Sequence, residues 1–234
     1  MINFLQRPIT VLFFFILIIQ GCASTQQRRD VEESGFLGDY SSLLKKGEGK
    51  QALLRYENPN ADWRSYTKVI LEPVTIWKDK ETKDVSPEDL QTLVNFFHGQ
   101  LYDALGKDYT IVQQAGPGVM RATFAITEAE SSDPVMDTIT SIIPQLRILT
   151  GVKGYIVGGK PGFVGSASIE MKLTDAQTET LLLAGADRRG GTKDLSGVTN
   201  EWNDVEKDYI YWAGMLRYRL CNLRGGTDCV KPEA

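Results

Sequence analysis

The first 22 residues constrain this chain more than any other part of its sequence. Arg7 and the amino terminus give a short positive region, and residues 9–19 are then apolar except for Thr10. A helix of this length rises only about 16 Å, about half of a bilayer's hydrocarbon core, so the run is too short to span a membrane. A positive region followed by such a run predicts a signal peptide over residues 1–21, which takes no part in the fold.

The signal ends in the sequence IIQGC at residues 18–22. A small residue directly before a cysteine, after an apolar run, resembles the lipobox of bacterial lipoproteins, although Ile19 and Gln20 depart from the commonest pattern. The resemblance implies that a diacylglycerol is attached to the thiol of Cys22, which becomes the first residue. The alternative is an ordinary cleaved signal peptide with an incidental cysteine. No Asp stands among the next two residues, which by the same resemblance implies an outer-membrane protein facing the periplasm.

The rest of the chain divides into a tether, one domain and a short tail. Residues 22–34 are polar with little apolar surface to bury, which predicts a flexible tether after the lipidated residue. Residues 35–229 suffice for a single domain with its own core, and residues 230–234 form a tail. The sequence has 26 Lys and Arg against 30 Asp and Glu, a net charge of −4. Nucleic acid is therefore not an expected partner, because binding it requires a basic face.

Hydrophobic periodicity predicts an α+β domain. A strand is expected at residues 68–77 with an interruption at Pro73, a helix from Pro87 to about 105, and a half-buried strand at 120–127. Residues 163–174 and 179–188 predict a hairpin around the turn Asp175-Ala176-Gln177-Thr178, and residues 201–221 a second long helix. The expected architecture is a mainly antiparallel sheet with helices packed on one face.

Several separate segments resemble one bacterial lipoprotein family, catalogued as domain of unknown function 3313. They are NPNADW at residues 58–63, KVILEPVTIW at 68–77, the hairpin VGSASIEMKLTDAQTETLLLAGADRRGG, and the W-x-D-V that opens the last helix. The resemblance covers residues 35–222. The family carries no assigned activity, so it implies a location and a domain boundary but no catalytic residues.

Motifs for catalysis, metals and nucleotides are missing or incomplete. His98 is the one histidine, and no Cys or carboxylate lies four residues further on to form a metal site with it. We therefore expect His98 to be a partly exposed residue of the helix. Residues 154–161 (GYIVGGKP) follow the phosphate-loop pattern until Pro161, which stands where Ser or Thr would ligate magnesium. The GSAS sequence at residues 165–168 lies in an expected strand and lacks the helix of a nucleophile elbow. We therefore expect no enzyme activity, no metal, no cofactor and no nucleotide.

Two neighbouring segments leave alternatives open. Residues 135–149 (VMDTITSIIPQLRIL) are mostly apolar and predict either a core helix broken at Pro144 or an exposed patch that meets a partner or the membrane. Residues 151–165 are rich in glycine and predict either a mobile loop or a lid that contacts a ligand.

The two cysteines after Cys22 are expected to pair. Cys221 and Cys229 remain in an oxidising compartment once Cys22 carries lipid, and Gly225-Gly226 between them allows the chain to turn back. The alternative is a buried Cys221 and a free Cys229. A disulfide would hold the tail against the last helix.

These observations favour a lipid-anchored envelope protein that is not an enzyme. The leading hypothesis is an interaction module that binds another envelope protein. The alternative is a binder or carrier of a small apolar ligand or lipid. An apolar cavity in the structure would favour the second hypothesis, and a flat apolar patch the first.

Overall fold

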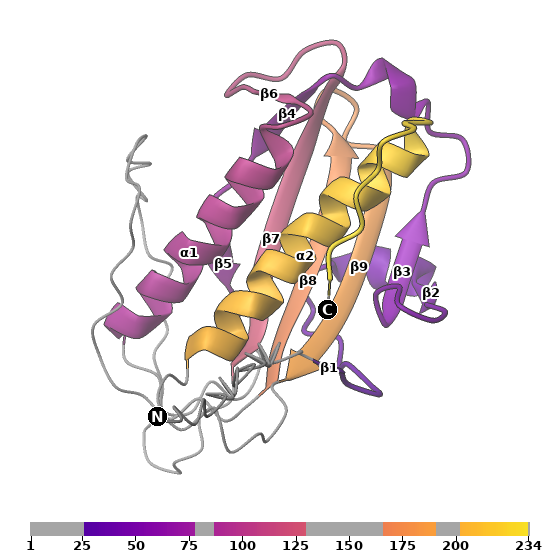
Figure 1. Ribbon diagram of the computed structural model, residues 1–234. Helices are drawn as coiled ribbons and strands as arrows, with labels where there is room; N and C mark the ends of the chain where they lie inside the picture. The colour runs from indigo at the N-terminus through magenta and orange to yellow at the C-terminus, as the bar shows by residue number, and fades with distance from the viewer. Residues whose placement is uncertain (1–25, 78–86, 130–165, 191–201, 234) are drawn as a thin grey trace, which may run out of the picture.

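A computed structural model describes residues 26–77, 87–129, 166–190 and 202–233 (Figure 1). The remaining residues lie outside this description. The helices are α1 (Pro87–Leu105) and α2 (Trp202–Leu223), with the short 3-10 turns η1 (Gly38–Leu43) and η2 (Trp63–Ser65). The strands are β1 (Gln26–Gln27), β2 (Lys45–Lys46), β3 (Leu54–Glu57), β4 (Lys68–Leu71), β5 (Thr75–Ile76), β6 (Thr110–Ile111), β7 (Val119–Ala129), β8 (Ser166–Asp175) and β9 (Leu181–Gly190).

The strands form one sheet in the order β2-β3-β9-β8-β7-β4-β6, with β1 added beside β9 and β5 beside β7. Strands β7, β8, β9, β3 and β2 pair antiparallel, whereas β4 pairs parallel with both β6 and β7, and β5 parallel with β7. The sheet is therefore mixed, and the expectation of a mainly antiparallel sheet is wrong. Both helices lie on the same face of the sheet, as expected (Figure 1).

The parallel pairing follows from the helix between the strands. The chain leaves β4, passes β5, and returns through α1 to the end of the sheet where it started, so that Lys68 lies opposite both Thr110 and Val119. Parallel neighbours need such a crossover, usually a helix. The strand expected at residues 68–77 is interrupted at Pro73 as predicted and becomes β4 and β5.

The bounds of the two helices agree with the prediction to within two residues. Each helix has an apolar stripe at helical spacing that is buried, and full burial of a large apolar side chain stabilises the fold by about 1.5–3 kcal/mol. The buried positions are Leu90, Leu93, Val94, Phe97, Leu101 and Leu105 on α1 and Val205, Tyr209, Trp212, Ala213, Leu216 and Leu220 on α2.

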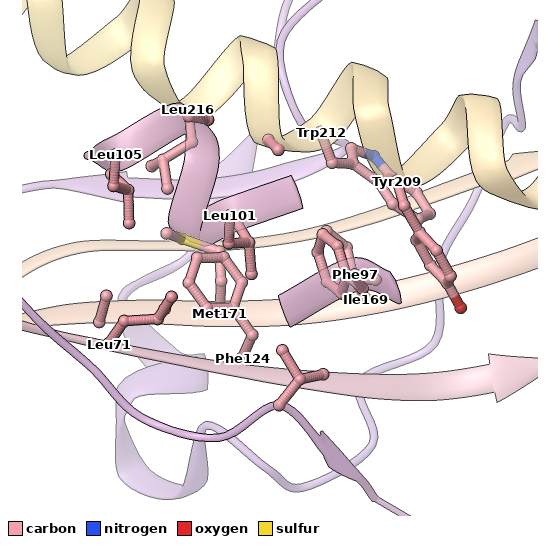
Figure 2. Close-up of a cluster of buried hydrophobic side chains, with 14 of the residues drawn as sticks. Leu71, Phe97, Leu101, Leu105, Phe124, Ile169, Met171, Tyr209, Trp212 and Leu216 are labelled. Atoms are coloured by element: carbon pink, nitrogen blue, oxygen red, sulfur yellow. The ribbon is translucent and has the colours of Figure 1, made fainter. Parts of the chain in front are cut away.

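The main core fills the space between the two helices and the sheet. Phe97 of α1 stacks on Tyr209 of α2 with ring centroids 4.6 Å apart and meets Phe124 of β7 edge-on at 5.7 Å. Figure 2 shows these rings with Trp212 and Ile169 between α2 and the strands. The three hydrophobic clusters are built from residues between Phe36 and Leu223, so the domain has a core of its own without the signal segment.

The predicted hairpin of β8 and β9 is present, and Asp175 organises its turn. One carboxylate oxygen of Asp175 accepts from the backbone N–H groups of Gln177 (2.9 Å) and Thr178 (2.8 Å), while the other accepts from the hydroxyl of Tyr66 (2.9 Å). Burial opposes the charged form, but these hydrogen bonds outweigh it and hold the pKa of Asp175 below its usual value. Burial and the Asp175 carboxylate raise the pKa of Tyr66 to about 12.

The start of the described chain lies against the sheet, which differs from the flexible tether expected through Ser34. Gln26 and Gln27 pair with Gly190 and Arg189 of β9. Further along, the N–H of Ser34 donates to the buried Glu170 (2.6 Å). The polar composition predicted a tether because the segment has little apolar surface to bury. Composition does not reveal hydrogen bonds that the segment can form with a strand.

Candidate functional site

A pocket of about 560 Å³ lies on the helix-covered face of the sheet, within the size range of small-molecule sites. It is bounded by α2, by β3 and the turn before it, by β9, and by the C-terminal tail at Lys231. Its apolar lining comes from the strands and from α2, and several of these side chains are labelled in Figure 2. They are Phe124, Ile169, Met171, Leu183, Trp212, Met215, Leu216 and Leu223.

The pocket lining also includes charged groups that are not buried, and we call these its rim. They are Glu48, Lys50, Arg55, Glu57, Arg219 and Lys231. Arg55 and Arg219 each place a terminal nitrogen 2.8 Å from the same Glu57 carboxylate oxygen. The pocket therefore combines an apolar interior with a charged rim, an arrangement suited to a ligand that has both characters.

Asp187 is the buried polar centre of the pocket wall. Its carboxylate accepts from the indole N–H of Trp212 (2.8 Å), the side-chain amide of Gln27 (2.6 Å) and the backbone N–H of Leu53 (3.2 Å). Burial raises the pKa of Asp187, although these hydrogen bonds and the charge of Arg189 act in the opposite direction. With its bonds satisfied inside the wall, Asp187 is a structural group that joins α2 to β9 and β3.

Gln27 connects the beginning of the chain to the pocket. Besides the bond to Asp187, its side-chain amide donates to the backbone oxygen of Gln51 (2.7 Å), which lies in the turn that lines the pocket. Gln27 follows Cys22 by five residues. The wall of the pocket is therefore close in the chain to the predicted lipid attachment.

A second buried polar pair lies next to Asp187 on the same face of β9. The guanidinium of Arg189 donates to Asp208 of α2 at 3.1 Å and lies 3.8 Å above the ring of Tyr211, which lines the pocket. Both charged side chains are almost fully buried. A buried charged pair fixes position when both partners are present, so this pair aligns α2 on β9.

The predicted disulfide between Cys221 and Cys229 is present, with Cα atoms 5.6 Å apart. Gly226 lies inside the loop, where an added Cβ would meet Cys221 Sγ at 2.7 Å and Cys229 Sγ at 3.2 Å. The tail then runs back along α2 (Figure 1), and Pro232 lies against Gly214, where an added Cβ would meet it at 3.0 Å. The disulfide thus holds the tail where Lys231 lines the pocket.

Several predicted positions lie outside the described residues. They are Cys22, the apolar segment 135–149, the glycine-rich segment 151–165 and the phosphate-loop-like residues 154–161. Ser166 and Ser168 are in strand β8, as the rejection of a nucleophile elbow expected.

The expectation of a partly exposed His98 is wrong. His98 is 5% exposed, at the edge of the buried stripe of α1, and burial lowers its pKa. Neither ring nitrogen has a hydrogen-bond partner among the residues that the structure describes.

No group of three or more of the described His, Cys, Asp or Glu side chains is arranged to hold a metal ion. No helix in the described part of the chain is both long and apolar enough to cross a membrane.

Sequence reasoning did not find the pocket. Its wall comes from β3 and the turn before it, which are too short to show periodicity, and from a tail more than 170 residues away in the chain. One signal was present. Asp187 and Arg189 are two residues apart in a strand that is apolar from Leu181 to Ala186, so they share the face of Leu183 and mark a buried polar site.

The sequence is similar to that of a curated lipoprotein. It is 26% identical over 184 residues to the Escherichia coli K12 protein named "Uncharacterized lipoprotein YdcL", which covers 77% of this chain and 80% of the relative. That name gives a class of protein and no molecular activity.

Two solved structures show weaker similarity. The PelC dodecamer from Paraburkholderia phytofirmans has 12% identity and a TM-score of 0.35, covering 74% of this chain and 96% of that one. A putative lipoprotein from Caulobacter crescentus has 13% identity and a TM-score of 0.29, covering 64% and 88%. Scores of this size support no conclusion about this chain.

The family assignment rests on a match over most of the domain. The family model described as "Protein of unknown function (DUF3313)" matches residues 32–216, which include the strands and helices that build the pocket, from β3 to most of α2. The chain therefore belongs to the DUF3313 family.

Proposed function

We propose that this chain is a lipid-anchored lipoprotein of the cell envelope, acylated at Cys22, that binds a small apolar ligand without catalysing a reaction. The observation that carries the proposal is the pocket of about 560 Å³ beneath α2, with an apolar interior open at a charged rim. Such a cavity is typical of ligand sites. An outer-membrane position facing the periplasm and an envelope protein partner stay predictions.

The pocket favours ligand binding over the interaction module. Five large apolar side chains among the described residues are exposed, and exposed apolar residues are normal on a protein surface. They are Leu43, Trp77, Tyr102, Ile210 and Val230. The apolar lining of the pocket, in contrast, comes from three strands and one helix that converge on one space. A bound apolar ligand would cover surface that is open to water without it, which stabilises the complex.

The test measures binding of the neutral dye N-phenyl-1-naphthylamine, which fluoresces in apolar surroundings. The chain from residue 23 onward is suitable, since the domain core is built from later residues. Wild-type protein is expected to bind the dye saturably at one site. Met215→Trp should reduce this binding at least tenfold, because the larger indole would occupy part of the pocket. Met215 lines the pocket and is partly exposed, so the fold should accept the substitution.

The matched control is Ile210→Trp, which puts the same side chain on α2 at an exposed position that does not line the pocket. Its dye binding should equal that of wild type. Absence of saturable binding in the wild type, or equal binding by Met215→Trp, would contradict the proposal.

A further inference from the structure

The rim of the pocket has an excess of positive charge. Among the charged side chains that line the pocket, four are cationic (Lys50, Arg55, Arg219 and Lys231) and three are acidic (Glu48, Glu57 and Asp187). Asp187 is buried in the wall with its carboxylate hydrogen-bonded, so the charged groups that are not buried have two more positive than negative charges, in a chain whose net charge is −4. A cationic rim on an acidic protein favours an anionic ligand, because the local field concentrates opposite charge at the opening.

Arg55 and Arg219 leave part of their binding capacity unused. Both guanidinium groups share one oxygen of Glu57, each at 2.8 Å, so one carboxylate faces two cations. Each guanidinium has five N–H donors. Arg55 uses a further one toward Gln51 (3.2 Å), while the Nε atoms of both arginines are buried with no hydrogen-bond partner within the described residues.

The two arginines are also placed where water screens them weakly. Their side chains are 26% and 22% exposed, and both line a pocket whose interior is largely apolar. Hydrogen bonds from guanidinium to an anion are charge-assisted and can be bidentate, which makes them stronger than neutral ones. The position therefore suits a carboxylate or phosphate group at the boundary between the apolar interior and water.

We infer that the pocket binds a long-chain amphiphile with an anionic headgroup, whose hydrocarbon lies in the apolar interior and whose head is held by Arg55 and Arg219. This inference rests on the proposed function, since it assumes that the pocket is a ligand site. A fatty acid and an anionic phospholipid share this chemistry. They differ in the head, which is a carboxylate in the first and a phosphate in the second.

The experiment displaces N-phenyl-1-naphthylamine with three twelve-carbon ligands: dodecanoate, dodecyl phosphate and dodecanol. We expect the better of the two anions to displace the dye from wild-type protein at a concentration at least tenfold lower than dodecanol. Raising the salt concentration should reduce this advantage only in part, because salt screens partly buried charges less than exposed ones. Tighter binding of dodecanoate favours a fatty acid, and tighter binding of dodecyl phosphate favours a ligand with a phosphate head.

Arg219→Gln should remove most of the advantage of the anions and leave dodecanol binding unchanged. Arg55→Gln is a second variant with the same expected result, in case the first does not fold. The matched control is Arg217→Gln, because Arg217 is on the same helix and pairs with Asp108 at 2.7 Å but does not line the pocket. The control should keep the wild-type preference.

The outcomes separate the two proposals. If dodecanol binds as tightly as both anions, or if Arg219→Gln and Arg55→Gln weaken all three ligands equally, the headgroup inference is wrong while the pocket remains a ligand site. If neither the dye nor any of the three ligands binds, the proposed function itself fails.

Discussion

At the scale of single residues, the acidic groups of this fold act in opposite ways. Asp175 is partly exposed, accepts several hydrogen bonds in its charged form and has a lowered pKa. Asp187 is buried, and burial raises its pKa in spite of three hydrogen bonds. The charge of Asp175 therefore favours folding at neutral pH, whereas the charge of Asp187 opposes it.

Asp175→Asn is expected to lower the free energy of unfolding by about 0.5–1 kcal/mol at pH 7, an amount limited by exposure of the turn. A carboxyl whose folded pKa is depressed stabilises the fold above its unfolded pKa, near 4, and loses that contribution as pH falls through its folded pKa. The difference between wild type and variant should therefore shrink toward zero in acid. Urea unfolding at pH 7 and near pH 3 measures it.

Tyr66→Phe is the control, because it removes one of the bonds to Asp175 and keeps the turn. A further variant, Asp175→Ala, removes every hydrogen bond that the carboxylate accepts, so at pH 7 it should lose more stability than Tyr66→Phe, which removes one of them. A difference between wild type and Asp175→Asn that stays constant down to pH 3 would show that the charge of Asp175 does not stabilise the turn.

At the scale of elements, the disulfide joins the end of α2 to a tail that has few other contacts to hold it in place. The tail contacts α2 through Pro232 at Gly214 and forms part of the pocket wall at Lys231. The closed loop is short, so its effect on the unfolded chain is moderate.

The double variant Cys221→Ser, Cys229→Ser is expected to lose about 2–3 kcal/mol of unfolding free energy. The tail should also exchange its amide hydrogens faster, since nothing covalent then holds it to α2. Wild type in reductant should match the variant, which provides the control. Two reactive thiols found by labelling the unreduced, unfolded mature protein would contradict the disulfide.

Sequence patterns predicted the long elements well and the short ones poorly. The apolar stripes of α1 and α2 and the alternation in β7 extend over enough residues to set a period, and the turn at Asp175 marks the hairpin of β8 and β9. Strands of two to four residues, such as β3 and β6, show no period, and their positions depend on which neighbour offers free backbone groups. The direction of β4 relative to β7 was also missed, because it depends on the crossover through α1.

At the scale of the whole molecule, the candidate site is a product of tertiary structure. Its lining comes from the turn and strand at residues 48–57, from the central strands, and from α2 with the tail. No local pattern links segments so far apart in sequence. The predicted anchor, in contrast, is a local motif, and sequence alone was enough to propose it.

Cys22→Ser should block acylation and processing together. The product is expected to be a precursor about two kilodaltons heavier than the processed chain, by the mass of its signal, and still held in the membrane by its apolar run. Ser24→Ala leaves Cys22 in place and should mature like wild type. Mass spectrometry of the purified proteins and partition into detergent distinguish the two, and normal maturation of the Cys22→Ser protein would exclude a lipoprotein.

The pairing of Gln26 with β9 sets how far the domain can travel in the acylated protein proposed above. Four residue steps separate Cys22 from Gln26, and an extended chain spans at most about 3.6 Å per residue, so the segment between the lipid and the domain is no longer than about 14 Å. With so short a connection the domain diffuses in two dimensions with the lipid bilayer and does not move through the volume beyond it. Whatever enters the pocket must arrive along that surface or be delivered to it.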